Sequence, residues 1–279
     1  ANRRGVPVVR LGAGVRTPAS SSPDEVANML VDQLADLLLT CQDDATDQLL
    51  RAGVPVERVR RIDNFVLDGL HAALRLSMAA GVSAGPIDAP QEFLADRHGY
   101  ALVALNRRER AESRHELADI VATLRAASRD LPIIWPVHPR FDKALDALKL
   151  RRSMAGERIA CLPYKSHVDF VSLLNNATCV LSDSWAVRVE SAALGIPSVL
   201  IGAVPGRSGS AGAEPNGGSG RGSPDVTRAV WECIFNGGAR SSGLRPAPGR
   251  SAPKVADALA DWLSKRGVSL YDNSIELQV

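Results

Sequence analysis

The sequence lacks several features that mark common classes of protein. Its 33 Lys and Arg residues nearly balance 31 Asp and Glu residues, which leaves a formal net charge of +2. Proteins that coat nucleic acid usually carry a large basic excess or a basic block, so we expect no nucleic-acid partner. There is no apolar run long enough to span a bilayer, and we therefore expect neither a secretory signal nor a membrane partner.

Cysteine is also scarce. Cys41, Cys161, Cys179 and Cys233 lie far apart, without CxxC spacing and without a metal-binding combination with histidine. No metal and no other cofactor is therefore expected. Cys161 and Cys179 lie in apolar runs and are expected to be buried thiols. Unpaired cysteines suit a reducing compartment, so we expect a cytoplasmic protein.

What is present is a regular alternation of short apolar runs and segments with helical periodicity. The 279 residues are 45% hydrophobic, which suffices for one large or two ordinary domains with real cores. Strands that alternate with helices imply right-handed crossovers and parallel sheets. The predicted fold class is α/β, with two Rossmann-like doubly wound domains of which the first is incomplete.

Composition predicts the domain boundaries. Residues 1–82 are expected to form the C-terminal part of the first domain, because the chain opens almost directly on a strand. Residues 83–97, which begin with a Gly- and Pro-containing stretch, are the predicted linker. Residues 98–279 are expected to form the second domain, interrupted at 203–223 by a flexible Gly- and Ser-rich insert.

A candidate anion site lies where an apolar run ends at Ser184 and a helical segment begins. A helix N-terminus offers free N–H groups and a positive dipole end, both of which favour phosphate. Ser184 can cap the helix and donate its hydroxyl to a phosphate. Glu190 lies too far into the helix to cap it, but its carboxylate could accept both hydroxyls of a ribose. Spacing alone slightly favours a simpler interpretation, an N-cap and a surface charge.

Other candidates also carry two interpretations. His138 ends a predicted strand and could donate to a phosphate oxygen, or be an ordinary loop histidine. Phe170 has the spacing of a core residue, which favours packing over stacking on a base. The three arginines within 106–113 suit an anion at the crevice between two domains or a salt-bridged loop. Asp24 and Glu25 in a first helical turn more often compensate the helix dipole than transfer protons.

Taken together, five segments resemble the non-hydrolysing UDP-N-acetylglucosamine 2-epimerases in order and spacing. They are residues 5–17, 49–70, 104–113, 133–139 and 162–202. The resemblance implies a glycosyltransferase-B-like fold that binds a UDP-sugar between its domains, and it makes a homodimer plausible. The UDP-binding residues that it implies are Arg16, Arg107, His138, Phe170, Ser184 and Glu190.

The sequence departs from the family at catalytic positions. The family has a glutamate at the position of Gly12, a glutamate at Asp24 and a histidine at Asn106. It has two glycines where this chain has Trp185 and Ala186, and the larger Trp185 is expected to crowd the diphosphate. Asp24 and Asn106 are therefore the catalytic candidates that the resemblance implies.

The family's reaction eliminates UDP across C1 and C2 and then adds it back with inversion at C2. It needs a base for the C2 proton and an acid that returns one. Asp24 can exchange protons, Asn106 can only hydrogen-bond, and Gly12 can do neither. Loss of one such group typically costs about 10²–10⁴-fold in rate. The expected function is a UDP-N-acetylglucosamine 2-epimerase-like isomerase. A diverged relative that binds or hydrolyses a UDP-sugar stays open, as does a glycosyltransferase of the same architecture.

Overall fold

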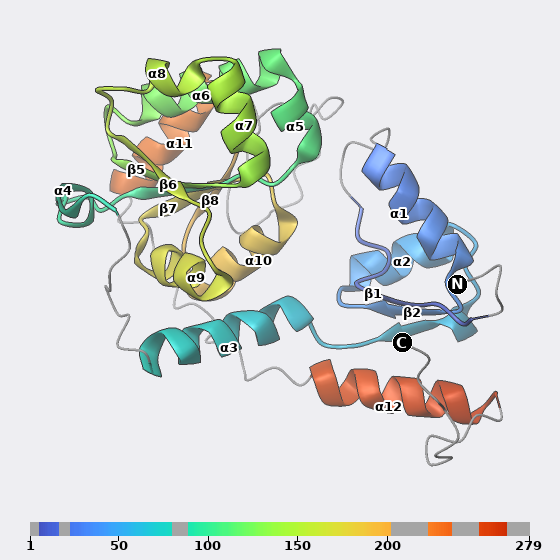
Figure 1. Ribbon diagram of the computed structural model, residues 1–279. Helices are drawn as coiled ribbons and strands as arrows, with labels where there is room; N and C mark the ends of the chain where they lie inside the picture. The colour runs from blue at the N-terminus through green and yellow to red at the C-terminus, as the bar shows by residue number, and fades with distance from the viewer. Residues whose placement is uncertain (1–5, 17–22, 80–88, 202–222, 236–250, 267–279) are drawn as a thin grey trace. The chain divides into compact units, whose positions relative to one another are not determined.

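The computed structural model describes most of the chain in two compact units. The described residues are 6–16, 23–79, 89–201, 223–235 and 251–266. Unit 1 comprises Ala1–Asp68 and Pro248–Val279, and unit 2 comprises Gly69–Ala247. Figure 1 traces both units.

Unit 1 is built on a three-stranded parallel sheet. Its strands β1 (Val9–Leu11), β2 (Leu37–Thr40) and β3 (Val59–Arg61) pair in that order. Its helices are α1 (Pro23–Leu34), α2 (Asp43–Arg51), the 3₁₀ turn Val56–Arg58 and α12 (Ser251–Ser264). Every residue of the central strand β2 is buried, as expected for a parallel sheet that is covered on both faces.

Alternation along β2 separates two small cores. Leu38 packs with Leu49 of α2, whereas Leu37 and Leu39 pack with side chains of α12 that include Trp262. Successive side chains of a strand point to opposite faces, so each helix covers its own face of the sheet. The sheet of unit 1 is thus held by one helix from early in the chain and one from near its end.

The contacts divide the chain differently from the predicted boundaries. Helix α12, which the prediction placed in the second domain, belongs to unit 1 because its apolar face covers β2. The division falls within α3 (Phe65–Ala79) and not at residues 83–97. Of that predicted linker, residues 83–88 lie outside the described residues, and Gln91–Leu94 forms the short helix α4.

Unit 2 contains a five-stranded parallel sheet, which confirms the predicted α/β class. The strand order is β6-β5-β4-β7-β8. The strands are β4 (Ala101–Ala104), β5 (Ile133–Val137), β6 (Ile159–Pro163), β7 (Cys179–Ser182) and β8 (Ser198–Leu200). Because the chain runs outward from β4 to β6 and then returns to β7, the strand order reverses between β4 and β7. Ligands of open α/β sheets bind at the carboxyl ends of the strands at such a reversal.

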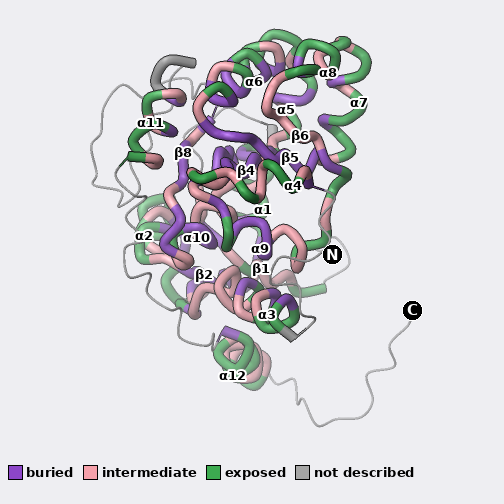
Figure 2. The backbone as a smooth tube through the Cα atoms, turned by 90° about the vertical axis from the view of Figure 1, so that its left-hand side faces the viewer, coloured by how far each residue is buried: buried purple, intermediate pink, exposed green. Residues whose placement is uncertain are grey.

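Helices cover both faces of the unit 2 sheet (Figure 1). One face carries α5 (Arg108–Glu112), α6 (Arg114–Ala127), α7 (Pro139–Ala147), α8 (Leu150–Ser153) and α11 (Ser223–Phe235). The other carries α9 (His167–Asn176) and α10 (Trp185–Leu194). Figure 2 shows the inner strands β4 and β5 as mostly buried tube, whereas the edge strand β6 is largely half-buried.

Two smaller predictions have mixed outcomes. Cys179 is fully buried as predicted, but Cys161 is only partly buried, because it lies on the strand β6 at the edge of the sheet. The predicted insert at 203–223 falls, up to residue 222, outside the described residues. In the described parts of the chain, no helix has both the length and the hydropathy needed to cross a bilayer.

Candidate functional site

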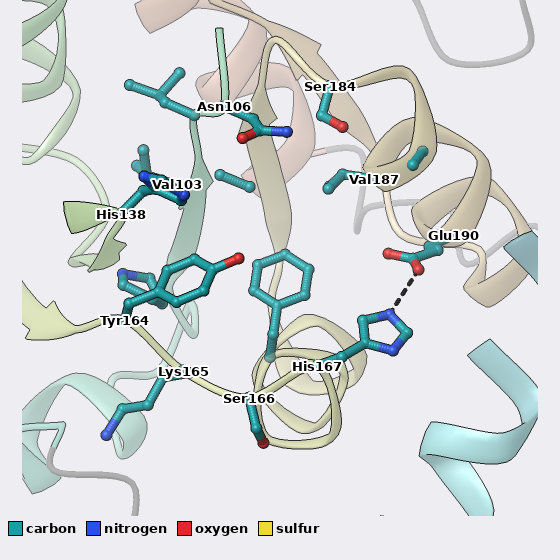
Figure 3. Close-up of a pocket in the computed structure, with 15 residues that line it drawn as sticks. Val103, Asn106, His138, Tyr164, Lys165, Ser166, His167, Ser184, Val187 and Glu190 are labelled. Carbon is teal, nitrogen blue, oxygen red and sulfur yellow. Dashed lines mark hydrogen bonds and ion pairs between the residues drawn. The ribbon is translucent and has the colours of Figure 1, made fainter. Parts of the chain in front are cut away.

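A pocket of about 440 Å³ opens at the carboxyl ends of β4 and β7 in unit 2 (Figure 3). Its walls come from the end of β4 and the residues after it, the end of β5, the segment between β6 and α9, and the first turns of α9 and α10. Small-molecule sites in proteins typically have volumes of about 300–1,000 Å³. The pocket therefore has the size and the position of a ligand site in a doubly wound sheet.

Five of the eight predicted site residues line this pocket. They are Asn106, His138, Phe170, Ser184 and Glu190. Arg107 belongs to the same loop as Asn106 but is not part of the lining. Arg16 lies in unit 1, where its Nη1 is 2.6 Å from Asp32 Oδ2. The side chain of Asp24 lies outside the described residues.

The loop after β4 is held by a buried aspartate. Asp183, which is 3% exposed, accepts hydrogen bonds from the backbone N–H groups of Asn106 at 2.9 Å and Arg107 at 3.2 Å. Sequence analysis assigned no role to Asp183, yet this residue joins the ends of β4 and β7. Its two bonds fix the backbone that presents Asn106 at the pocket.

The expectation that the arginines of this loop suit an anion fails for Arg110. Its side chain is 4% exposed, lies 3.6 Å from Asp183 and donates to the carbonyl of Ile201. Burial lowers the pKa of Arg110, and Asp183 opposes that shift. Arg108 is exposed and pairs with Glu112 at 2.6 Å. Charge in the sequence does not distinguish a buried ion pair from a ligand contact.

Helix α10 points its N-terminus at the pocket through Ser184, Ala186 and Val187. Ser184 is the N-cap residue, but its side chain makes no capping hydrogen bond, so the predicted cap is wrong. Ser182 instead accepts the Ser184 backbone N–H at 3.0 Å. The first N–H groups of α10 thus have no side-chain cap, and they form an anion-binding position beside the Ser184 hydroxyl.

Glu190 is a buried pocket residue, so its interpretation as a surface charge is wrong. It is 5% exposed, and its Oε1 lies 2.8 Å from His167 Nε2. Burial raises the pKa of Glu190, and the hydrogen bond from His167 opposes that rise. The dashed line in Figure 3 marks this pair, which joins α9 to α10 at the pocket wall.

His138 takes part in helix capping as well as lining the pocket. Its Nδ1 accepts the backbone N–H of Arg140 at 3.2 Å, and its ring meets Tyr164 edge-on at 4.9 Å between centroids. Burial and the neighbouring charge of Arg140 lower its pKa, which favours the neutral ring. A neutral ring that accepts at Nδ1 carries its proton on Nε2, which is then a hydrogen-bond donor.

Sequence reasoning missed the segment Tyr164, Lys165, Ser166 and His167, all of which line the pocket. The signal was available, because these polar residues directly follow the carboxyl end of β6 at the same sheet edge as the other candidates.

Two substituted family positions look different in three dimensions. The pocket lining includes Ala186 but not Trp185, which does not support the expected crowding by Trp185. Gly12 has φ of +72°, and a Cβ there would lie 3.3 Å from the ring of Phe65. The backbone at Gly12 is thus left-handed, a conformation that a glutamate adopts only with strain.

Comparisons with known proteins identify the family of the chain. Residues 1–232 match the family model described as UDP-N-acetylglucosamine 2-epimerase. This chain belongs to that family. Among the described residues, no group of His, Cys, Asp or Glu could hold a metal ion.

Similar proteins in the family are distant in sequence. The chain is 22% identical over 204 residues to a UDP-N-acetylglucosamine 2-epimerase of Methanococcus maripaludis, and 24% identical over 209 residues to one of Methanocaldococcus jannaschii. Each match covers 72% of this chain and 55% of the relative. The chain thus spans about half the length of the curated relatives it matches.

Solved structures of the family share the fold. The Methanocaldococcus jannaschii UDP-GlcNAc 2-epimerase in complex with UDP-GlcNAc and UDP matches with a TM-score of 0.76 at 22% identity, over 93% of this chain and 70% of that one. The Neisseria meningitidis enzyme bound to UDP-GlcNAc matches with a TM-score of 0.72 at 18% identity, over 93% of this chain and 71% of that one. These likenesses support the glycosyltransferase-B-like fold.

Proposed function

We propose that the unit 2 pocket binds the UDP part of a UDP-N-acetylhexosamine. We further propose that the protein interconverts UDP-N-acetylglucosamine and UDP-N-acetylmannosamine by elimination and re-addition of UDP. The observation that carries the proposal is that one cavity combines the uncapped N-terminus of α10, the ring of Phe170 and the buried carboxylate of Glu190. These are, respectively, a site for phosphate, a surface for a base and an acceptor for ribose hydroxyls.

The diphosphate takes the N-terminus of α10. The helix dipole and the free N–H groups favour an anion there, and the effect of the dipole alone is about 0.3–1 kcal/mol. The Ser184 hydroxyl is not used as a cap and is free to donate. His138, with its proton on Nε2, supplies a second neutral donor on the pocket wall.

Uracil takes Phe170 and the ribose takes Glu190. Phe170 is partly buried and packs against the core beneath α9 while it also lines the pocket, so packing in the core is compatible with the proposed stacking on a base. Stacking of a base on an aromatic ring contributes about 1–3 kcal/mol. The Glu190 carboxylate accepts several hydrogen bonds, enough for His167 and for both hydroxyls of a ribose.

Asp24, the catalytic position that the family resemblance implies, is the proposed acid–base residue for proton transfer at C2. Asn106 lines the pocket and donates a hydrogen bond to phosphate, and it has no proton to exchange. Because Gly12 and Asn106 replace titratable groups, turnover is expected to be slower by about 10²–10⁴-fold for each lost group that acts in proton transfer. The same two residues favour a second candidate function, which is binding of a UDP-sugar without turnover.

A proton NMR time course of UDP-N-acetylglucosamine with the protein in D₂O tests the proposal. Epimerisation predicts new sugar signals and deuterium at C2, and the Asp24→Asn variant should abolish both. Signals of the free sugar that grow with time, without deuterium at C2, would indicate hydrolysis of the UDP-sugar. Broadened ligand lines without any new signal would indicate that the protein binds the UDP-sugar without converting it. Unchanged sharp lines would contradict the proposal for this substrate.

A further inference from the structure

We propose that His167 is a positioning residue that holds the Glu190 carboxylate in place and thereby gives the pocket its preference for ribose over 2′-deoxyribose. The proposal rests on the proposed function, because it concerns how the same pocket recognises its nucleotide. It adds a residue that the family resemblance does not assign, and it makes ribose recognition a property of a pair of side chains from two helices.

The geometry of the pair is the first argument. His167 is the first residue of α9, directly after the N-cap Ser166, and Glu190 lies in the second turn of α10. The two side chains meet at 2.8 Å between Nε2 and Oε1, and both line the pocket. Among the described residues, His167 is the side chain that hydrogen-bonds Glu190.

The burial of Glu190 is the second argument. A carboxylate that is 5% exposed loses most of its hydration, and isolated charges in such surroundings tend to become protonated. The His167 hydrogen bond acts against this by favouring the ionised form. Without His167, Glu190 would be a poorer acceptor and would also be free to change its rotamer.

The two oxygens of the Glu190 carboxylate can bind different partners, which is the third argument. An ionised carboxylate has about four acceptor positions, and His167 occupies one of them, on Oε1. The remaining positions, including those of Oε2, can accept both hydroxyls of a ribose. A 2′-deoxyribose lacks one hydroxyl and therefore donates one hydrogen bond fewer to Glu190. A carboxylate held in place discriminates between the two sugars, whereas a mobile carboxylate can rearrange around either one.

The exposure of His167 makes the pair accessible and the test practicable. The His167 side chain is 50% exposed, so its replacement leaves no buried cavity. Calorimetric titrations with UDP and with 2′-deoxy-UDP measure the ratio of the two dissociation constants. Since a hydrogen bond to a charged group contributes about 1.5–3 kcal/mol, the wild-type protein should bind UDP about tenfold or more tightly than 2′-deoxy-UDP.

His167→Phe keeps the ring but removes the hydrogen bond, and it should lower this ratio to about threefold or less. His167→Gln returns a side-chain donor and should restore part of the ratio. In a Glu190→Gln background, His167→Phe should change the ratio no further, because its partner is already altered. His115→Phe is the matched control, since His115 is 87% exposed on α6 and outside the pocket, and it should leave the ratio unchanged.

The outcomes separate the two proposals. If the wild-type protein prefers UDP and the folded His167→Phe variant keeps the full ratio, the positioning role is wrong while the UDP site stands. If His167→Phe weakens both nucleotides equally, the residue contributes to binding but not to ribose selection, and the proposal is also overturned. If the wild-type protein binds neither nucleotide, the proposed function is wrong, and the role proposed for His167 is wrong as well.

Discussion

Asp32 in unit 1 and Glu190 in unit 2 are both buried carboxylates, but their partners differ. In unit 1, Asp32 is fully buried and lies 3.1 Å from Arg10 Nε and 2.6 Å from Arg16 Nη1. In unit 2, Glu190 is nearly as buried, but its partner is a half-exposed histidine and it lines a cavity. Arginine stays charged at any ordinary pH, so the unit 1 group is a fixed ion pair within the fold.

The difference shows which features identify a functional site. Burial of a charge by itself is equally compatible with a structural ion pair. A buried acid that lines a cavity, and that keeps acceptor positions beyond the one its partner uses, is arranged for a ligand. Arg16 illustrates the point. The family resemblance predicted it as a UDP contact, and in the structure it forms an ion pair with Asp32.

The largest expected effect comes from removing Asp32, the buried acid of unit 1. Asp32→Ala removes the buried counter-charge of Arg10 and the nearer of the two buried carboxylates beside Arg16, the other being Glu25 at 3.8 Å, and should lower the free energy of unfolding by about 3–5 kcal/mol. Urea unfolding checks this. Asp261→Ala is the control, because Asp261 pairs with Lys265 at the exposed surface of α12, and its loss should cost at most about 0.5 kcal/mol. Equal effects would show that the unit 1 acid is not structural.

A second change separates stacking from packing in unit 2. Phe170→Ala should weaken UDP binding by about 5–100-fold, because it removes the surface for the base. Phe93 is also partly buried against the same core but does not line the pocket. Phe93→Ala should therefore destabilise the fold with little change in UDP affinity, and calorimetry together with urea unfolding measures both effects. Similar losses of affinity in the two variants would remove Phe170 from the site.

A third prediction concerns pH. Burial raises the pKa of Glu190 above its usual 4.5, so the folded protein holds this proton more tightly than the unfolded chain. The stability that Glu190 contributes in its protonated form is present below that usual value and is lost as pH rises through the raised folded pKa.

Glu190→Gln cannot lose this proton. The stability of the wild-type protein minus that of the variant should therefore fall as pH rises from about 4 and then level off. Urea unfolding at a series of pH values measures the difference. A difference that does not change with pH would contradict the burial argument.

The smallest expected effect compares two serines. Ser113 accepts the N–H of Glu116 and caps α6, so Ser113→Ala should cost about 1 kcal/mol of stability without affecting UDP. Ser184 makes no capping bond, so Ser184→Ala should cost less than about 0.5 kcal/mol but weaken UDP several-fold through the lost hydroxyl. The reverse pattern would show that Ser184 is only a cap.

Local patterns in the sequence predicted most of the elements. The apolar run of β2 and the periodicity of α6 were recognisable, because burial requires apolar residues at fixed intervals. Strand β3 was not predicted, since two of its three residues are arginines and only Val59 is buried. Local periodicity does not place helix α12 on the sheet of unit 1, because that position depends on contacts between distant parts of the chain.

The site divides in the same way. His138 and Ser184 were candidates because each follows the carboxyl end of a predicted parallel strand, and Asn106 was a candidate because of the family resemblance; all three line the pocket. The pairing of Asp183 with the loop after β4, and of His167 with Glu190, could not be predicted, because these hydrogen bonds join segments that only the fold brings together.

The most direct test of the central claim is a crystal structure of the protein with UDP. The account predicts uracil against Phe170, the diphosphate at the N-terminus of α10, and ribose hydroxyls within about 2.5–3.2 Å of the Glu190 carboxylate. UDP bound elsewhere, or bound in this pocket with its ribose turned away from Glu190, would contradict it.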